Sequence, residues 1–461
     1  MKGMKVLSIG ENKGAPRVWI TGNLPAKAGF MPGVRFRLET LRDRDCIALC
    51  VDENGTRKVS AKKTKEKEVP VIDLNSFEAL GLFKGLDQIR VVADTNKIYI
   101  LPLASETRLR TRLARLRSKL EAGDPLSVGS LSHGGGILSL AIHQGLSSSG
   151  VQSKLAFAND IRDELLEQAC DVNPAWSQET IALATPMQEL AFDQWGMNRL
   201  GEIDILEAGL PCEASSRAGR AKNKNVCVES HERVGHLVAA FIAIIAKTNP
   251  SVVVLENVVP YQQTASSWII RHQLRDLGYN IHETVFKGEE WGTLEHRERM
   301  CLVAVTKGME FDSSLIRSND PSAPCLGIVL DDINPDSETY REVGYLKDKE
   351  SRDKEAGKGF SVPYLTPEAT SVPTLRKGYH KGGSCDARLL HPTDPNRSRL
   401  LTANEHARCK GIPEVVVQGL SQTIAHELLG QSVLFPPFKA LGAYIGDMLK
   451  SFTRINVAQH V

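Results

Sequence analysis

Between residue 126 and about residue 306 the sequence alternates between short apolar runs and amphipathic segments, and this alternation constrains the fold more than any other feature. Five runs are predicted to be strands because they are short, apolar and rich in β-branched residues. These runs are LSVGSLS, KLAFAND, IDILEAGL, SVVVLENV and MCLVAVT. Helices are predicted around residues 137–146, 161–171, 231–247 and 265–277. Strands that alternate with helices form a mostly parallel sheet covered on both faces, so we expect a doubly wound α/β domain.

The first hundred residues contain a diverged internal repeat. Residues 16–39 and residues 70–94 each place a short strand after a proline, then a helical turn, a Gly-x-x-x-Gly motif and a second strand. Between the copies, Asn54-Gly55 predicts a hairpin turn. Small β units of this kind cannot each bury a face alone, so the two copies are expected to pack together in a domain over residues 1–104.

The first copy of this repeat resembles the swapped-hairpin DNA-binding domains of the AbrB/SymE-like type. That resemblance implies that two copies in one chain imitate a dimer of such domains and bind DNA. A small accessory β domain that only packs on its neighbour is the alternative.

A basic helix is predicted over residues 105–125. Its leucines recur at helical spacing, its basic residues line another face, and Gly123 and Pro125 end it. The basic positions are Arg108, Arg112, Arg115 and Lys119. Two interpretations are open: this face contacts phosphates, or it is the solvent-exposed side of an amphipathic linker.

Composition excludes several classes of protein. The chain has 461 residues with a formal net charge of +2, so any basic patch must be local. Its nine cysteines include no Cys-x-x-Cys pair, which indicates neither a disulfide framework nor a structural zinc site. No apolar stretch is long enough for a membrane span, and the N-terminus lacks the pattern of a signal peptide. We therefore expect a cytoplasmic protein without a metal site.

A glycine cluster marks the first candidate ligand site. Gly134, Gly135 and Gly136 lie between a predicted strand and a predicted helix, where missing side chains let a ligand approach the backbone. The next strand ends in Asn159-Asp160, and an acid at that place can accept hydrogen bonds from ribose hydroxyls. Several nucleotide cofactors suit this geometry, so the pattern alone does not identify one.

Three further features lie at the same predicted edge of the sheet. Cys212 follows its strand and a proline, Glu256 ends an apolar strand, and Arg297 and Arg299 stand two apart at a strand entrance. Singly, the cysteine could be a small buried apolar residue, the glutamate a helix cap and the arginines surface cations. Because all four residues are predicted to lie at the same edge of the sheet, a single shared functional site is favoured.

From about residue 126 to its end the chain resembles a C5-cytosine DNA methyltransferase. The motifs that carry the resemblance stand in family order. They are HGGGI, AND, GLPCEASS, LENV, EHRER, RLLTANEHARCKGIPE and LLGQSV. The resemblance implies the Rossmann-like fold of S-adenosylmethionine-dependent methyltransferases, formed by residues 126–306 and 421–461, with a target-recognition region inserted over residues 307–420.

The resemblance also implies a cofactor, S-adenosylmethionine, and the residues that bind it. These are Ser132, Gly134, Gly136, Asp160, Leu210, Gln431 and Ser432. Some positions depart from the family pattern. Ser132 replaces an aromatic residue, Thr185 replaces an acid expected at the adenine amine, and Glu295 replaces a glutamine.

The implied reaction is methyl transfer to C5 of a cytosine flipped out of duplex DNA. Cys212 would add to C6 as the nucleophile, Glu256 would hold the N3/N4 edge, Arg299 would bind O2 and Arg297 would orient the loop or the base. Two groups of residues are expected to contact DNA. Arg217, Arg220 and Lys222 would hold phosphates, and Arg376, Lys377, Tyr379 and Lys381 would reach the major groove. For the second group, a solvated loop without DNA contacts is the alternative.

Three rival functions remain open at this point. A decayed scaffold that binds DNA without catalysis is favoured by the departures at Ser132 and Thr185. An RNA cytosine-5 methyltransferase would keep the chemistry, and a nicotinamide oxidoreductase would leave Cys212 and Glu256 without a role. The chemistry needs one chain, so a monomer is expected. The residues reveal neither the target sequence nor whether a cognate restriction endonuclease exists.

Overall fold

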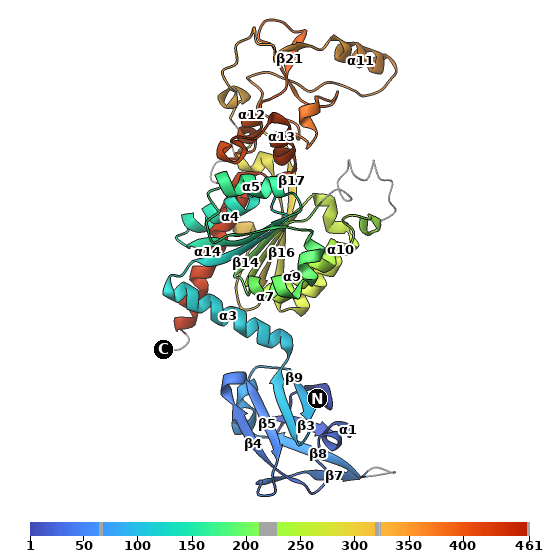
Figure 1. Ribbon diagram of the computed structural model, residues 1–461, viewed down its shortest axis with the longest axis vertical. Coiled ribbons are helices and arrows are strands. Elements are labelled where there is room, and N and C mark those ends of the chain that lie inside the picture. Colours follow the sequence, from blue (N-terminus) through green and yellow to red (C-terminus); the bar gives the residue numbers. More distant parts are fainter. Residues whose placement is uncertain (64–67, 212–227, 319–321, 323, 459–461) are drawn as a thin grey trace. The chain divides into compact units, whose positions relative to one another are not determined.

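The computed structural model describes residues 1–63, 68–211, 228–318, 322 and 324–458 (Figure 1). The chain divides into two compact units, Met1–Arg110 and Thr111–Val461. Among the described residues, no helix is both long enough and apolar enough to cross a bilayer.

The first unit consists of two antiparallel sheets that share one core. The larger sheet has the strand order β1 (Gly3–Ser8), β9 (Gln88–Asp94), β10 (Lys97–Pro102), β5 (Cys46–Val51), β4 (Arg35–Leu41) and β6 (Arg57–Lys58). The smaller has the order β2 (Gly10–Asn12), β3 (Ala15–Thr21), β8 (Glu68–Asn75) and β7 (Ser60–Lys63). The connections between the sheets contain α1 (Asn23–Lys27), α2 (Phe77–Leu80) and the 3-10 helix η2 (Gly81–Phe83), whereas the 3-10 helix η1 (Arg42–Arg44) joins β4 to β5 within the larger sheet.

The repeat found in the sequence has the same element order in both copies. The first copy is β3, α1 and β4, and the second is β8, α2 and β9. The first strands of the copies pair with each other, with Val18 opposite Leu74, whereas the second strands lie in the larger sheet. The copies therefore interlock around one apolar core, as expected for units that cannot bury a face alone.

The predicted hairpin at Asn54-Gly55 is wrong. Strands β5 and β6 flank these residues but do not pair, because β4 lies between them and β10 occupies the other edge of β5. The glycine has another role. A Cβ at Gly55 would lie 2.4 Å from the carbonyl carbon and oxygen of Phe36, so its missing side chain lets the two backbones cross closely.

The second unit is built on a seven-stranded sheet, which confirms the predicted α/β fold. The strand order is β13 (Ile181–Ala184), β12 (Ser153–Asp160), β11 (Leu126–Leu131), β14 (Ile205–Gly209), β15 (Val252–Asn257), β17 (Glu298–Thr306) and β16 (Tyr279–Lys287). Strand β17 is antiparallel to both of its neighbours, and the other described pairs in this sheet are parallel. The start of β17 therefore lies at the edge where β11, β12, β14 and β15 end.

Helices cover both faces of this sheet (Figure 1). One face packs against α4 (Ile137–Ser148) and α14 (Phe435–Ala458), with α5 (Asp163–Val172) beside them. The other packs against α6 (Met187–Phe192), α7 (Gln194–Leu200), α9 (Leu237–Thr248) and α10 (Ala265–Asp276). Short 3-10 helices lie in the connections: η3 (Val228–Ser230), η4 (Val259–Gln263) and η5 (Gly288–Trp291).

Helix α3 (Ala104–Ala122) is the predicted basic helix, but for three of its four basic residues both interpretations are wrong. Arg112 is buried and stacks 4.0 Å from the centre of the Tyr279 ring. Arg115 and Lys119 pair with the buried carboxylate of Asp204, at 3.1 Å and 2.5 Å. These cations therefore pack α3 against the rest of the second unit. The sequence did not indicate this, because Asp204, which neutralises Arg115 and Lys119, is distant from them in sequence.

The region after β17 is irregular, with short strands around two small apolar clusters. It contains β18 (Arg341–Glu342), β21 (Arg397–Arg399), β20 (Arg388–Leu390) and β19 (Tyr364–Leu365), in this order, α11 (Gly344–Glu355), and η6 (Ser313–Leu315), η7 (Leu326–Val329) and η8 (Tyr379–Lys381). The chain then forms α12 (Ala403–Cys409), η9 (Glu414–Val417) and α13 (Gln422–Gln431). Side chains of α12 and α13 join the core on the α4 face of the large sheet.

Candidate active site

The glycine loop joins β11 to α4 in a strained, closely packed turn. Ser132, Gly134 and Gly136 all have positive φ, of 53°, 54° and 73°. A Cβ at Gly136 would lie 2.5 Å from a ring nitrogen of His133, whereas a Cβ at Gly134 would meet no atom within 4 Å. The loop is therefore packed against the protein at Gly136 and faces open space at Gly134.

The carboxylate of Asp160 lies beside this open side of the loop. The backbone N–H groups of Gly134 and Arg162 donate to its two oxygens at 2.7 Å and 3.0 Å, so the loop and the end of β12 hold it in place. The next residue, Ile161, is 66% exposed. An exposed apolar side chain next to a half-buried carboxylate can contact the ring of a base, while the carboxylate accepts hydrogen bonds from hydroxyl groups. Ile161 was not among the site residues predicted from the sequence.

The end of β13 is tied to the same edge by an amide that sequence reasoning did not single out. Asn159 is buried and donates from Nδ2 to the backbone oxygens of Leu183 and Thr185, at 2.9 Å and 2.7 Å. Thr185, at the position of the family acid, is thus fixed through its backbone.

The remaining cofactor candidates are placed unevenly. Leu210 is buried, and its carbonyl accepts from Asn257 Nδ2 at 3.0 Å. Ser432 donates to the carbonyl of Leu429 at 2.8 Å, whereas the side chain of Gln431 is exposed. Helix α13 does return beside the glycine loop, since a Cβ at Gly135 would lie 2.4 Å from Leu428.

A buried ion pair joins the predicted acid to one of the predicted arginines. Glu256 ends β15, and its Oε1 lies 2.7 Å from Nε of Arg299. The register accounts for this contact, because Glu256 stands opposite Cys301 and Arg299 is two residues earlier on the same face of β17. Burial raises the pKa of Glu256, and the charges of Arg299, Arg297 and Lys410 oppose that shift.

Arg297 is held by the protein more tightly than Arg299. It donates from Nη1 to Glu295 Oε1 at 3.1 Å and from Nη2 to the carbonyl of Gly430 at 2.8 Å. Burial and the nearby charge of Arg299 lower its pKa to about 10, so its guanidinium stays protonated at neutral pH. Arg297 therefore connects the start of β17 to the end of α13.

Glu295 itself is fully buried and faces two further groups. Its Oε2 lies 3.7 Å from Nζ of Lys410 and 3.9 Å from Nε2 of His406. Burial lowers the pKa of His406 well below its usual value, so this ring is neutral. Lys410 also donates to Oγ of Ser432 at 3.0 Å, which links the arginine motif to a cofactor candidate. Sequence reasoning did not single out Lys410 or His406.

The recognition segment lies directly against this cluster. Residues 294–296 and Val372 exchange backbone hydrogen bonds, and the N–H of Leu375 donates to Glu295 Oε1 at 3.2 Å. A Cβ at Gly430 would lie 2.3 Å from the nitrogen of Lys377. Arg376 and Lys377 are exposed, with Arg376 bonded to Asp386 at 2.6 Å. These two candidates for DNA contact thus stand next to the arginine motif.

The prediction that Tyr379 contacts DNA is wrong. Its side chain is fully buried; its hydroxyl donates to the carbonyl of Ala387 at 2.7 Å and accepts from the N–H of Leu401 at 2.9 Å. The aromatic ring fills the core of the recognition region. Lys381, two residues on, is exposed.

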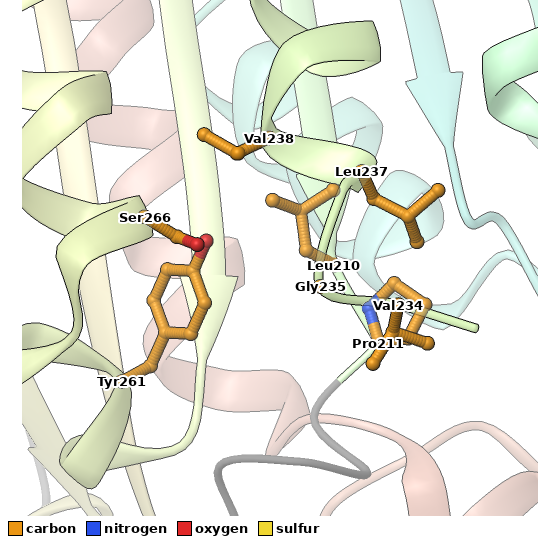
Figure 2. A pocket seen from close by; sticks show the side chains of 8 residues that line it. All are labelled: Leu210, Pro211, Val234, Gly235, Leu237, Val238, Tyr261 and Ser266. Atoms are coloured by element: carbon orange, nitrogen blue, oxygen red, sulfur yellow. The ribbon is translucent and has the colours of Figure 1, made fainter. Parts of the chain in front are cut away.

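A small apolar pocket lies just after the end of β14 (Figure 2). Its lining residues are Leu210, Pro211, Val234, Gly235, Leu237, Val238, Tyr261 and Ser266. Figure 2 shows Tyr261 and Ser266 on one side and Leu210 and Pro211 on the other. Four predicted site residues lie outside the described residues. They are Cys212, Arg217, Arg220 and Lys222. The described chain reaches Pro211, and a Cβ at Gly209 would lie 3.4 Å from Glu256 Oε2.

The side chains and backbone groups at this edge fit the ribose and base of a nucleoside. The carboxylate of Asp160, the exposed Ile161 and the open side of Gly134 suit a ribose and a base. Among the described residues, no group of three His, Cys, Asp or Glu side chains could hold a metal ion.

Fold and site together define an S-adenosylmethionine-dependent methyltransferase fold whose ligand edge carries a glutamate–arginine pair. The family model of the C-5 cytosine-specific DNA methylases matches residues 140–447, about two thirds of the chain. The chain belongs to this family.

Curated relatives are similar over half to two thirds of the chain. The type II methyltransferase M1.ScrFI of Lactococcus lactis subsp. cremoris is 27% identical over 255 residues, 54% of this chain and 63% of that protein. M.NlaX of Neisseria lactamica is 27% identical over 247 residues, 52% of this chain and 74% of that protein. The DNA-cytosine methyltransferase of Escherichia coli (strain K12) is 26% identical over 353 residues, 66% of this chain and 70% of that protein. The chain thus spans less than two thirds of the length of M1.ScrFI.

Solved structures show the same fold. The S. pombe Dnmt2 methyltransferase superposes with a TM-score of 0.54 at 16% identity, over 71% of this chain and 99% of that one. The Entamoeba histolytica methyltransferase EhMeth gives 0.55 at 16% identity, over 70% and 98%. At this identity the likeness concerns the fold alone.

Proposed function

We propose that the protein is a DNA (cytosine-5-)-methyltransferase that acts on a cytosine flipped out of duplex DNA. The observation that supports this most is the Glu256–Arg299 pair, 2.7 Å apart at the edge of the sheet where β14 ends. In the sequence, Cys212 follows three residues after the end of β14. A nicotinamide oxidoreductase would have no use for this acid and guanidinium, or for the cysteine that follows Pro211 in the sequence.

Each residue has a role set by its chemistry. The Cys212 thiolate adds to C6, which makes C5 electron-rich enough to accept a methyl group; loss of the C5 proton then expels the thiolate. Glu256 binds the N3/N4 edge of the base, and Arg299 neutralises the charge that gathers on O2. Because Arg299 contacts Glu256, their ion pair holds in place both side chains that would bind the base. Arg297, held by Glu295 and Gly430, positions the strand that carries Arg299.

S-adenosylmethionine, when bound, supplies an electrophilic methyl group. Asp160 would accept hydrogen bonds from the ribose of the cofactor, and Ile161 would cover one face of its adenine. The open side of Gly134 would let the cofactor approach the backbone of the glycine loop. Ser132, Gly136 and Ser432 shape the surrounding turns, whereas Gln431 is exposed and able to turn toward the ligand.

The decisive experiment measures methyl incorporation from labelled S-adenosylmethionine into duplex DNA and, separately, into transfer RNA. We expect product in the DNA arm. Cys212→Ser should abolish it while leaving duplex binding intact, and Glu256→Gln should lower the rate by about 100-fold or more. Cys170→Ser is the matched control, because Cys170 is a free, exposed cysteine on α5. Equal activity of Cys212→Ser and Cys170→Ser would overturn the mechanism, and product only in the RNA arm would overturn the substrate.

We further propose that the recognition region reads the duplex with Arg376 and Lys377. Both side chains are exposed, and their backbones lie against Gly430 beside the arginine motif. Replacing Lys377 with alanine should weaken binding to duplex DNA several-fold, and an unchanged affinity would remove this segment from the interface. Bisulfite sequencing of DNA from expressing cells identifies the target sequence.

Finally, we propose that the first unit binds the DNA backbone, as its resemblance to AbrB/SymE-like domains implies. Residues 1–110 hold 20 lysines and arginines against 13 acids, a net charge of +7, whereas the rest of the chain carries −5. The exposed strand β7 presents Lys62 and Lys63. Phosphate binding makes affinity depend on salt, with a slope that changes by about 0.9 for each phosphate that the protein no longer neutralises.

Charge reversal tests this role in the full chain. Lys62→Glu should weaken duplex binding and flatten its salt dependence. Lys154→Glu is the control of equal charge change, because Lys154 lies at the start of β12, at the opposite end of that strand from Asp160. Indistinguishable effects of the two variants would contradict a DNA-binding first unit.

A further inference from the structure

A second buried carboxyl group lies next to the proposed catalytic one. Glu207 is in the middle of β14, the central strand of the large sheet, and its side chain is 2% exposed. In the register, Glu207 stands opposite Ser130 on β11, and Gly209 stands opposite Glu256 on β15. Glu207 and Glu256 therefore point to the same face of the sheet from neighbouring strands.

The surroundings of Glu207 contain hydroxyl groups and one acid. Ser130 from β11 and Ser139 from α4 face its carboxyl, and the charge of Glu256 acts on it from β15. Its Oε1 has no hydrogen-bond partner among the described residues. The nearby cations Arg299, Arg297 and Lys410 act on Glu256. An ionised carboxylate buried without a cation is costly, so this group favours its neutral form.

A chain of hydrogen bonds leads from Trp176 through the glycine loop to Ser130, which faces this carboxyl. Trp176 Nε1 donates to Nε2 of His133 at 3.0 Å, so that ring nitrogen is an acceptor. Burial lowers the pKa of His133 to about 3, which leaves the ring neutral with its proton on Nδ1. Nδ1 then donates to Oγ of Ser130 at 2.7 Å. The hydroxyl hydrogen of Ser130 is left free to point at Glu207.

We propose that Glu207 is a positioning residue that carries a proton in the working protein, so that Glu256 is the one ionised carboxyl of the pair and keeps its contact with Arg299. This role rests on the proposed function for its effect on catalysis, although the proton itself does not. Burial raises the pKa of Glu207 to about 8, with the charge of Glu256 adding to the shift and the two serines opposing it. Above that pH a second negative charge would stand beside Glu256 without a cation of its own among the described residues and would repel the Glu256 carboxylate.

The proton has a consequence for stability that does not involve catalysis. The pKa of Glu207 is about 8 in the folded protein and about 4.3 in an unfolded chain. Between these values the folded protein holds a proton that the unfolded chain releases, so stability falls as pH rises through this window. Relative to a variant without the group, the unfolding constant should rise about tenfold per pH unit in the window and level off above pH 8.

The test compares wild type with Glu207→Gln, which has the shape of the neutral acid, in urea unfolding from pH 5.5 to pH 9.5. We expect the ratio of their unfolding constants to follow the slope of one proton up to about pH 8. Glu179→Gln is the control: Glu179 is an exposed acid paired with Lys154, and its replacement should leave the slope unchanged. Parallel curves for wild type and Glu207→Gln would overturn the proposal.

Two further measurements keep the proposal testable. In wild type alone, the infrared carbonyl band of a protonated carboxylic acid should be present at pH 7 and disappear near pH 8, and its absence at pH 7 would overturn the proton even if Glu207→Gln did not fold. In methyl transfer, wild type should lose rate above pH 8 while Glu207→Gln keeps it. Shared alkaline loss would refute the positioning role, whereas absence of methyl transfer in both proteins would refute the proposed function and leave the stability test valid.

Discussion

The crossing of α4 and α14 depends on a glycine, and its replacement gives the sharpest prediction about the fold. A Cβ at Gly145 would lie 2.2 Å from the carbonyl oxygen of Lys439, 2.6 Å from the nitrogen of Ala443 and 2.7 Å from Cα of Gly442. All three are backbone atoms of α14, so no side chain can rotate away. Gly145→Ala therefore has to push the two helices apart by about 1 Å, since ordinary Cβ contacts begin at 3.4 Å.

The expected loss of stability combines two opposing effects. Overpacking of a closely packed interface costs about 1–3 kcal/mol, and contact with rigid backbone puts this site at the upper end. Alanine is the better helix former by about 1 kcal/mol. The free energy of unfolding of the second unit should therefore fall by about 1–2 kcal/mol. Because α4 begins at the glycine loop, affinity for S-adenosylmethionine should fall as well.

Urea unfolding followed by tryptophan fluorescence measures this change, because four of the five tryptophans lie in the second unit. Gly344→Ala is the matched control. Gly344 begins α11, and a Cβ there would meet no atom within 4 Å, so this variant should be as stable as wild type or slightly more stable. If Gly145→Ala unfolded at the same urea concentration as Gly344→Ala, the close approach of the two helices would not be a constraint.

Three other perturbations act on contacts within the second unit. Gly430→Ala should push away the recognition segment and weaken duplex binding about tenfold, by anisotropy, because its Cβ would lie 2.3 Å from the nitrogen of Lys377; unchanged binding would contradict this. Arg299→Lys keeps the charge but removes the Nε atom that touches Glu256, so kcat should fall about 100-fold, and a near-normal kcat would show that geometry is unimportant. Asp204→Asn should destabilise the protein by about 3–5 kcal/mol at pH 7. Burial alone would raise the pKa of Asp204, but hydrogen bonds from Lys119 and Ser127 bring it below its usual value. Its contribution is therefore present above about pH 4 and lost as pH falls through the folded pKa, so wild-type and variant unfolding curves should converge in acid.

The large sheet could be predicted from the sequence because its central strands are buried on both faces. A continuous β-branched run such as that of β15 is typical of a strand in this position. The edge strands β13 and β16 were missed for the same physical reason. Most residues of β13 are exposed and β16 is largely half-buried, so neither shows a continuous apolar pattern.

Local patterns misled where a distant partner decides the structure. The basic face of α3 looked solvent-exposed, but Asp204, just before β14, neutralises Arg115 and Lys119. The Asn54-Gly55 pair has hairpin chemistry, yet pairing of β5 with β4 and β10 leaves it no edge. In both cases the deciding contact lies far away along the chain.

The candidate site was predictable as an edge but not as a network. Parallel topology alone places Asp160 and Glu256 at the carboxyl ends of their strands. The buried links from Glu295 to Lys410 and from Ser130 to Glu207 join residues far apart in the sequence, and no motif pairs them with each other, so only coordinates reveal these links. The catalytic and binding roles themselves stay predictions, which methyl incorporation and duplex-binding assays decide.

The reversed direction of β17 sets a minimum length for the segment that leads into the recognition region. The strand starts at the ligand edge, and its nine residues span about 30 Å, so Thr306 lies at the opposite edge of the sheet, beside Ser251. The next buried contact near the ligand edge is made by Leu326, which packs with Leu294. A fully extended chain spans at most about 3.5 Å per residue. At least roughly nine residues are therefore needed to return from Thr306 to the ligand edge. The recognition region can vary in size beyond Leu326, but the segment that connects Thr306 to Leu326 cannot be shorter than this limit.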